Sequence, residues 1–537
     1  MLGSAKMLDK VDVLIIGAGA SGAAVAWSLA ETKMHIVCLE QGDWMNPAEY
    51  PATRRDAEAR NGDSFAINPN RRAGSADYPI NEDNSPIKVA NFNAVGGGTV
   101  LYGAHTPRFH PSDFRVRTLD GVADDWPLDY AMLAPFYDLN DRMMGTSGLA
   151  GDPAYPPKPQ VMPPLPMGRA TMALARGFNR LGWHWWPSDT AIASQEYQGR
   201  PPCINLGKCT FGCAQGAKGS TDITYWPEAI RAGVKLRTRA RVREITLGPD
   251  GMANGVVYYD AEGREQFQPA HIVILASNGI GTPRLLLNSA NARFPRGLAN
   301  SSDQVGRNLM FHPYVWITGY FDEELDGERG PDNSYWSHEF YETDLSRGFV
   351  RGFCYEFSRG EGTAATAVEG VETGRIPWGE AHHDAYRRLH RRTTGLGAIL
   401  EDLPEAHNRV TLDPALKDGN GIPAPKIDYT LSENSRRMMG FAIARGTDIL
   451  QAAGAYEVEG GLLDRGGWHL MGTARMGNDP ATSVVNAWGR SHDVRNLFIV
   501  DGSIFITSAG VNPTHTIQAL ALYIADQIKQ RLGTLFD

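Results

Sequence analysis

Short apolar runs and a glycine-rich turn alternate at the start of the chain. Residues 11–16 (VDVLII) form an apolar run with β-branched side chains, as does a strand buried on both faces of a parallel sheet. The alanine-rich residues 23–30 favour a helix, and residues 34–42 (MHIVCLEQG) form a second apolar run. The pattern predicts a strand–helix–strand unit, which is typical of an α/β fold with a parallel sheet.

Further along, the pattern separates connecting segments from strands. Residues 44–90 are polar with little periodicity, and we expect loops and short helices there. Residues 152–166 are too rich in proline for a helix or a central strand, which indicates a crossing between two lobes. Residues 234–247 alternate as one strand, with GVVYYD at 255–260 as its hairpin partner, and residues 271–277 predict another buried strand.

Residues 315–460 follow a different pattern, in which apolar and polar positions alternate over short stretches such as 408–414 and 427–431. Such alternation suits an antiparallel sheet with one exposed face. Residues 497–528 then return to the strand and helix pattern of the start. We therefore predict an α/β protein with a doubly wound, Rossmann-like domain and a second domain built on a mainly antiparallel sheet.

Composition narrows the class of protein. The 537 residues are 42% hydrophobic and 21% charged, an ordinary globular composition, and the net charge of −9 argues against a nucleic-acid partner. No apolar run reaches the length of a membrane span, and the start MLGSAKMLDK lacks the apolar core of a signal peptide. We expect a cytoplasmic protein, or a periplasmic one if it is exported with a partner that carries the signal. Five cysteines do not make a disulfide framework.

The glycine-rich turn carries the first candidate chemistry. GAGASG, from Gly17 to Gly22, fits the pattern G-x-G-x-x-G between a predicted strand and a predicted helix. The glycines let backbone amides and the helix N-terminus approach a pyrophosphate. Glu40 ends the next strand 18 residues past Gly22, where an acidic residue grips a ribose hydroxyl. The motif predicts dinucleotide binding and leaves NAD and FAD open.

Four separated stretches resemble one family. The glycine turn is the first, and NFNAVGGGTVLYGAHTPRF (91–109) is the second. ASNGIGTPRLLLNSA (276–290) with VGRNLMFHP (305–313) is the third, and HLMGTARMG (469–477) with VDGSIFITSAGVNPTHTIQALA (500–521) is the fourth. Together they resemble the glucose–methanol–choline (GMC) oxidoreductases, which are FAD enzymes. Within that family the chain looks most like bacterial sugar and alcohol dehydrogenases, such as gluconate and glucoside dehydrogenase large subunits, and like pyranose oxidase.

The resemblance implies both the domains and the cofactor contacts. Residues 8–150, 200–314 and 462–537 would form a discontinuous FAD-binding domain. Residues 151–199 and 315–461 would form the substrate-binding domain and the crossings between lobes. The resemblance assigns to FAD binding Gly17, Gly19, Ser21, Gly22, Glu40, Gly97, Gly98, Thr99, Val242, Asp501, Gly502, Asn512, Pro513 and Thr514.

His469 matches the family's catalytic histidine, and Asn512 matches its partner. Alcohol oxidation removes a proton from oxygen and a hydride from carbon, and a flavin takes the hydride at N5. A neutral imidazole is a suitable base near neutral pH, and the Asn512 amide can hold the substrate oxygen as charge develops. Glycines around His469 (Gly466, Gly467 and Gly472) would let the imidazole approach a planar ring.

Other histidines compete with His469 for a role. His515 is about one helical turn past Asn512 and is expected to be structural, and His312 is expected to pack or cap. His105 lies four residues beyond Leu101, and Leu101 occupies the position at which some relatives attach FAD through a histidine. The resemblance therefore implies FAD bound without a covalent link.

Three of the five cysteines cluster at Cys203, Cys209 and Cys213, separated by five and three residues. Thiolates at such spacings bind iron–sulfur clusters or zinc, and bacterial FAD glucose dehydrogenases of this family carry a three-iron cluster in the matching loop. Relatives have a further cysteine where this chain has Ile204. A three-iron cluster is the expectation, and three free or partly disulfide-linked thiols are the alternative.

The sequence thus predicts an FAD-dependent enzyme that oxidises an alcohol, a secondary hydroxyl of a sugar or glycoside above all. An aromatic or aliphatic alcohol is the alternative substrate, and a dehydrogenase is favoured over an oxidase. An electron-accepting subunit or a cytochrome is the expected partner. An NAD enzyme would not account for the C-terminal stretches, and a non-catalytic flavoprotein would bind FAD without being reduced by any alcohol.

Overall fold

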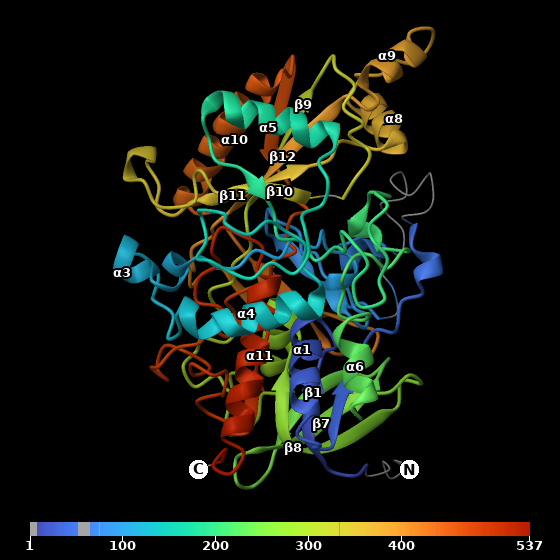
Figure 1. The fold of residues 1–537 in the computed structure, drawn as a ribbon. Coiled ribbons are helices and arrows are strands. Elements are labelled where there is room, and N and C mark those ends of the chain that lie inside the picture. Colours follow the sequence, from blue (N-terminus) through green and yellow to red (C-terminus); the bar gives the residue numbers. More distant parts are fainter. Residues whose placement is uncertain (1–7, 52–64, 73, 75, 332, 537) are drawn as a thin grey trace.

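A computed structural model describes residues 8–51, 65–72, 74, 76–331 and 333–536. The start of the chain, residues 1–7, on which part of the signal-peptide argument rests, lies outside these ranges. Figure 1 shows two sheets, one in each half of the molecule, with helices against their outer faces. We call the domain around the lower, mainly parallel sheet the FAD domain and the domain around the upper sheet the substrate domain, after their predicted ligands.

The FAD domain is built on a seven-stranded sheet, and its centre confirms the strand–helix–strand prediction. The apolar strand β1 lies parallel to β2 on one side and to β8 on the other. The residues of β2 and β8 that pair with it are buried. In order the strands are β5 (Lys235–Arg237), β2 (Ile36–Leu39), β1 (Val11–Ile16), β8 (Glu265–Leu275), β7 (Ala253–Tyr259) and β6 (Arg241–Leu247), with β16 (Leu497–Ile499) also paired to β8.

Helices from both ends of the chain cover this sheet. Helix α1 (Ala20–Ala30) packs against α11 (Thr514–Gln530) near the C-terminus and against α6 (Tyr225–Arg231). Helix α4 (Tyr130–Met144) lies across α11 (Figure 1), and α7 (Asn278–Asn288) follows β8 along the chain. The sheet and the helices that cover it thus come from separated segments of the chain.

The prediction of a single strand over 234–247 is wrong. The segment forms two strands, β5 and β6, which lie at opposite ends of the strand order. Between them Arg239 takes a left-handed conformation, with φ of 52°, and turns the chain. The apolar–polar alternation continues through this bend, so the pattern alone could not reveal it.

The substrate domain is built on a six-stranded sheet of the order β15, β9, β12, β11, β10 and β4. Its pairings are antiparallel, as predicted for this region. The long helix α10 (Glu433–Ala453) and α5 (Arg169–Leu181) cover its outer face. The strands are β15 (Glu457–Leu462), β9 (Tyr314–Tyr320), β12 (Thr393–Leu400), β11 (Phe353–Ser358), β10 (Asn333–Ser337) and β4 (Trp186–Pro187).

A third, three-stranded sheet divides the segment predicted as one substrate-domain unit. Strands β13 (Arg409–Lys417) and β14 (Pro423–Asp428) form the expected antiparallel pair, but β14 also pairs with β3 (Asn81–Asn84) from the first segment. Helix α7 of the FAD domain packs on both strands of the pair. This hairpin thus lies against the FAD domain, inside the range 315–461.

Helices α8 (Thr363–Glu372) and α9 (His382–Leu389) project from one side of the substrate domain (Figure 1). Two shorter helices, α2 (Pro69–Arg72) and α3 (Val116–Asp120), lie in the connections. Within the described residues, no helix is long and apolar enough to cross a membrane.

The glycine turn between β1 and α1 requires glycine for two different reasons. Gly17 has a φ of +103°, and a Cβ there would lie 2.5 Å from the carbonyl oxygen of Ala276. A Cβ on Gly22 would collide with the carbonyl oxygen of Gly17. A Cβ on Gly19 would meet only the Cα of Gly97, at 3.9 Å. The turn therefore packs only with glycine at positions 17 and 22, whereas position 19 has room for a Cβ atom.

We predict that Gly22→Ala lowers the free energy of unfolding by about 1–3 kcal/mol or more, because the new methyl group meets fixed backbone. Gly19→Ala is the matched control, because its Cβ has room and the change affects only the N-cap of α1, which we expect to cost less than about 1 kcal/mol. Chemical denaturation of the apoproteins measures both. Equal destabilisation by the two substitutions would contradict this account.

Candidate active site

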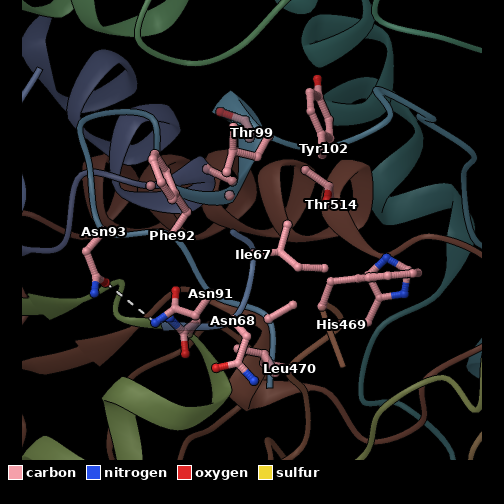
Figure 2. A pocket seen from close by; sticks show the side chains of 18 of the residues that line it. Ile67, Asn68, Asn91, Phe92, Asn93, Thr99, Tyr102, His469, Leu470 and Thr514 are labelled. Carbon is pink, nitrogen blue, oxygen red and sulfur yellow. Dashed lines mark hydrogen bonds between the residues drawn. The ribbon is translucent and has the colours of Figure 1, made fainter. Parts of the chain in front are cut away.

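A cavity of about 900 Å³ lies between the two domains and receives side chains from both. In Figure 2, Asn91, Thr99 and His469 project into this space. Most residues that the resemblance assigns to FAD or to catalysis line its wall. These are Gly17, Gly19, Ser21, Glu40, Gly97, Gly98, Thr99, Val242, His469, Asp501, Gly502, Asn512, Pro513 and Thr514. Gly22 is the exception, because it packs under the turn and does not face the cavity.

The acidic side chain at the end of β2 is held in place by backbone amides. The Glu40 carboxylate accepts hydrogen bonds from the amide nitrogens of Ala18 and Gly42, each at 2.8 Å. Burial raises the pKa of Glu40, and the backbone hydrogen bonds lower it. The carboxylate is thereby fixed beside the glycine turn, at the edge of the cavity where a ribose is expected.

Asp501 is fixed in a similar way on the C-terminal side. Its carboxylate accepts from the Thr282 hydroxyl at 2.6 Å and from the amide nitrogen of Ser503 at 2.9 Å. Gly97 and Gly98 present no side chain to the cavity, and the N-terminus of α1 opens towards it. The volume, the open helix end and the two fixed carboxylates fit an extended dinucleotide such as FAD.

His469 lies in the wall of the cavity and contacts a second histidine. Its Nδ1 is 2.7 Å from Nδ1 of His312, and the two rings are nearly perpendicular, at 84°. Nε2 of His312 lies 2.7 Å from the carbonyl oxygen of Ala509 and 3.2 Å from that of Ser508. A carbonyl oxygen only accepts, so the proton of His312 is on Nε2.

This arrangement fixes the tautomer of His469. Burial lowers the pKa of His312 to about 4, so at neutral pH the ring carries one proton and Nδ1 holds a lone pair. His469 must then donate from its own Nδ1, which leaves Nε2 as the nitrogen that can accept a proton. Burial and the nearby His312 lower the pKa of His469 well below its usual value. His469 is thus a neutral base of defined orientation.

His312, expected to pack or cap, is fully buried and hydrogen-bonds two backbone carbonyl groups, and it also orients His469. His312 lies in the VGRNLMFHP stretch that carries part of the family resemblance. This position is the sequence feature that could have indicated a role beside His469. By contrast, His515 is structural, as expected. It is fully buried, its Nδ1 lies 2.7 Å from the Asn140 amide nitrogen, and it does not line the cavity.

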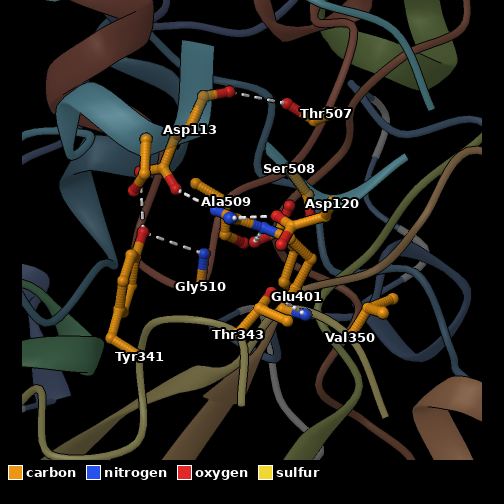
Figure 3. Close-up of polar contacts among 12 residues, drawn as sticks. Asp113, Asp120, Tyr341, Thr343, Val350, Glu401, Thr507, Ser508, Ala509 and Gly510 are labelled. Carbon is orange, nitrogen blue, oxygen red and sulfur yellow. Dashed lines mark hydrogen bonds and ion pairs between the residues drawn. The ribbon is translucent and has the colours of Figure 1, made fainter. Parts of the chain in front are cut away.

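The turn that supplies the two carbonyl groups is itself anchored. Ala509 takes a left-handed conformation, with φ of 56°, and the amide nitrogen of Gly510 donates to the Tyr341 hydroxyl at 3.2 Å. Tyr341 in turn donates to Asp113 at 2.7 Å, as Figure 3 shows. The position of His312 therefore depends on this buried polar network.

Arg351 lies at the centre of the network and is buried. Its guanidinium group contacts three carboxyl groups, those of Asp113 at 2.5 Å, Glu401 at 2.8 Å and Asp120 at 2.9 Å. Three acidic groups around one cation cannot all be charged at low cost. In agreement, burial raises the pKa of Glu401 to about 8 and also raises that of Asp113, while Arg351 lowers both. The sequence offered no signal for this cluster, because its members are far apart in the chain.

A carboxylate that the sequence did not single out also lies in the cavity wall. Glu356 of β11 is 2.5 Å from Nδ1 of His105 and accepts from the Tyr314 hydroxyl at 2.9 Å. Leu101 also lines the cavity and offers no nitrogen for a covalent link. Non-covalent FAD therefore remains a prediction.

The three clustered cysteines line a separate cavity of only about 20 Å³. Burial raises the pKa of the Cys203 thiol, and Cys209 is buried. In the part of the chain that the structure describes, no group of three or more His, Cys, Asp or Glu residues is arranged to hold a metal ion. The residues present do not fit a three-iron cluster.

Comparison with known proteins identifies the family. Two family models, both described as GMC oxidoreductase, match residues 160–314 and 404–521. The chain is 41% identical to the 2-methyl-1,2-propanediol dehydrogenase of Mycolicibacterium austroafricanum, over 98% of this chain and 97% of the relative. The chain belongs to the GMC oxidoreductase family. GMC oxidoreductases are flavoproteins that bind FAD and oxidise alcohols, which removes the alternative of an NAD enzyme.

Other relatives of this GMC oxidoreductase differ in activity. It is 29% identical to the fructose dehydrogenase large subunit of Gluconobacter japonicus, over 96% of this chain and 97% of the relative. It is 31% identical to paromamine 6'-oxidase of Streptomyces fradiae, over 97% and 92%. Among solved structures, pyridoxine 4-oxidase from Mesorbium loti is similar, with a TM-score of 0.67 at 17% identity over 97% of this chain and 99% of that one. This last similarity confirms the fold.

We predict that Arg351→Met lowers the free energy of unfolding by about 3–5 kcal/mol, because buried carboxyl groups lose their cation. Arg387→Met in α9 is the matched control, because Arg387 is exposed, and it should change stability by less than about 0.5 kcal/mol. Denaturant unfolding measures both variants. A loss below about 1 kcal/mol for Arg351→Met would contradict the role given to this ion cluster.

Proposed function

We propose that this GMC oxidoreductase oxidises one hydroxyl group of a polyhydroxylated alcohol, a diol or a sugar, to a carbonyl. The observation that carries the proposal is the oriented, neutral His469 in the wall of a cavity that fits FAD. The names of the 2-methyl-1,2-propanediol and fructose dehydrogenases support the substrate class. The secondary hydroxyl of a sugar, expected from the sequence, lies within this class, and a simple aliphatic or aromatic alcohol is the alternative.

The protein's part in the reaction begins with a proton. Nε2 of His469 accepts the proton of the substrate hydroxyl, while Nδ1–H of the same ring remains bound to His312. The carbonyl groups of Ser508 and Ala509 prevent His312 from turning, so the base keeps its direction. When bound, FAD supplies the acceptor for the hydride that leaves the substrate carbon.

Asn512 assists by holding the substrate oxygen. It lines the same cavity as His469 and immediately precedes Pro513 and helix α11. Its amide NH₂ donates to the oxygen as negative charge develops there, and an amide does not titrate, so the interaction is independent of pH.

We also propose that the electrons pass to an acceptor other than oxygen, through an electron-accepting subunit or a cytochrome. Two of the relatives are named dehydrogenases, which supports this choice, and the paromamine 6'-oxidase relative is the argument against it. Rates of turnover with oxygen and with an artificial quinone acceptor distinguish a dehydrogenase from an oxidase. A higher rate with oxygen would contradict the dehydrogenase assignment.

A redox cluster at Cys203, Cys209 and Cys213 is not part of the proposed reaction, because these thiols are not arranged as a metal-binding group in the described part of the chain. Iron and acid-labile sulfide analysis of protein purified without oxygen tests this point directly. The cluster expected from the sequence contains three irons. A content of about three irons per chain would therefore show that the cluster is present.

Anaerobic visible spectra test the central proposal. Purified enzyme is titrated with diols, sugars and simple alcohols, and bleaching of the flavin bands by one class establishes the reductive half-reaction. A folded protein with bound flavin that no alcohol bleaches would be a non-catalytic flavoprotein and would overturn the proposal.

We predict that His469→Ala lowers the rate of flavin reduction by about 100- to 10,000-fold, the usual contribution of a general base. Flavin content should be retained, because the glycine turn and the fixed carboxylates are unchanged. His383→Ala in the exposed helix α9 is the matched control and should leave the rate unchanged. Stopped-flow spectroscopy measures the rates, and near-normal reduction in the His469 variant would exclude it as the base.

The pH dependence provides a separate test. Only the neutral form of His469 accepts a proton, so activity falls as pH decreases through its pKa. A histidine of ordinary pKa would lose about three quarters of its neutral form at pH 6. Because the pKa of His469 lies well below the usual 6.5, we expect the reduction rate to vary less than about twofold between pH 8 and pH 6. A decline centred near pH 6.5 would contradict the assignment.

A further inference from the structure

Strand β11 carries a buried acidic residue, Glu356, on the face that borders the cavity. Its alternate residues Phe353, Tyr355 and Phe357 pack into the core under α5 and α10. The opposite face of the strand turns Glu356 and Ser358 towards the cavity. The Glu356 side chain is only 2% exposed, and burying a carboxylate is costly unless donors satisfy it.

Donors from both domains hold the two oxygen atoms of Glu356. His105 Nδ1, from the FAD-domain segment, lies 2.5 Å from Oε1, and the hydroxyl of Tyr314, from strand β9, lies 2.9 Å from Oε2. Burial and the nearby Glu356 raise the pKa of Tyr314 well above its usual value. The phenol thus stays protonated and donates its hydrogen to the carboxylate.

The neighbouring strand is shaped to permit this contact. A Cβ at Gly397 of β12 would collide with the hydroxyl oxygen of Tyr314. Gly397 is paired with Glu356 across the sheet. Because Gly397 has no side chain, nothing at this position separates Tyr314 from the carboxylate. A larger residue at 397 would require the Tyr314 hydroxyl to move from its position beside Glu356.

The carboxylate and the catalytic base share one wall of the cavity. The ring of Tyr314 packs edge-on against Trp468, with centroids 5.2 Å apart, and Trp468 directly precedes His469. Tyr314, Trp468, His469 and Glu356 all line the cavity. A carboxylate accepts about four hydrogen bonds, so Glu356 can accept from a ligand while His105 and Tyr314 hold it.

We infer that Glu356 is a specificity-determining residue, which accepts a hydrogen bond from a second hydroxyl group of the substrate while His469 deprotonates the first. The inference rests on the proposed function and deepens it, because it makes the enzyme selective for alcohols that carry a second hydroxyl. Glu356 accepts hydrogen bonds from His105 and Tyr314, whereas the base is oriented through His312, so we assign the carboxylate a contribution to substrate choice.

Matched substrate pairs test the inference. Wild-type holoenzyme is compared on 1,2-propanediol and 1-propanol, and on 1,3-propanediol and 1-propanol, by kcat/KM for flavin reduction. We expect at least one diol to exceed the monoalcohol by about tenfold or more, since a hydrogen bond to a charged group is worth at least that factor. In E356Q the preference should fall to less than about threefold, with the monoalcohol value little changed.

The Glu356→Gln substitution keeps the shape of the site. The amide oxygen can still accept from His105, and the amide NH₂ can donate to the Tyr314 hydroxyl. Glu369→Gln is the matched control, because Glu369 also borders the cavity but lies exposed on α8, and it should retain the diol preference. An equal loss for diol and monoalcohol in E356Q, or the same collapse in E369Q, would overturn the inference.

A measurement on the wild-type enzyme tests the inference even if the E356Q variant does not fold. Pinacol and 2,3-dimethyl-2-butanol share one carbon skeleton and carry only tertiary hydroxyls, so neither can be oxidised to a carbonyl, and they differ in having two hydroxyls or one. Pinacol should inhibit flavin reduction with an inhibition constant at least about tenfold lower than that of 2,3-dimethyl-2-butanol. Equal inhibition together with equal use of diols and monoalcohols would reject the role of Glu356 and leave the alcohol oxidation intact. If no alcohol reduces the flavin, the proposed function itself fails.

Discussion

The hydrogen bonds from Nε2 of His312 to two backbone carbonyl groups determine the chemistry of the site. They place the proton of His312 on Nε2, and this assigns the single proton of His469 to Nδ1. A base that has only one free nitrogen acts in only one direction. The low pKa of both rings follows from the same burial, so orientation and protonation state have a common physical origin.

The polar network around Arg351 extends this control beyond the cavity. It links the turn at 507–510 to the FAD-domain residue Asp113 and to Glu401, which follows the substrate-domain strand β12. A buried cluster of this kind is costly unless every member is satisfied, and it therefore specifies one arrangement of the parts it joins. His312 and His469 lie where the two domains meet and depend on both.

Much of the FAD domain could be predicted from the sequence, because its signals are local. The apolar run at 11–16, the glycine turn and Glu40 lie within one unit, and in the structure Ile16, much of the glycine turn and Glu40 border the cavity. The bend at Arg239 and the pairing of β14 with β3 could not be predicted, since alternation does not show where a strand turns or which partner it finds. His312, Glu356 and Arg351 were missed for a related reason, because their roles arise from contacts between distant segments. The contact of His312 with His469, which the expectation of a packing residue did not include, is of this type.

The order of the segments along the chain has a consequence for synthesis and folding. Strand β16 joins β8 in the FAD-domain sheet, and the base, Asn512 and helix α11 all come from the last segment, after the chain has passed through the other domain. A chain growing on the ribosome therefore exposes the glycine turn early but cannot close the cavity until nearly all of it has been made. Such non-local pairing makes assembly slow. Formation of the complete dinucleotide pocket is thus a late event, and loss of the segment from His469 onwards would remove the proposed base, Asn512 and part of the pocket together.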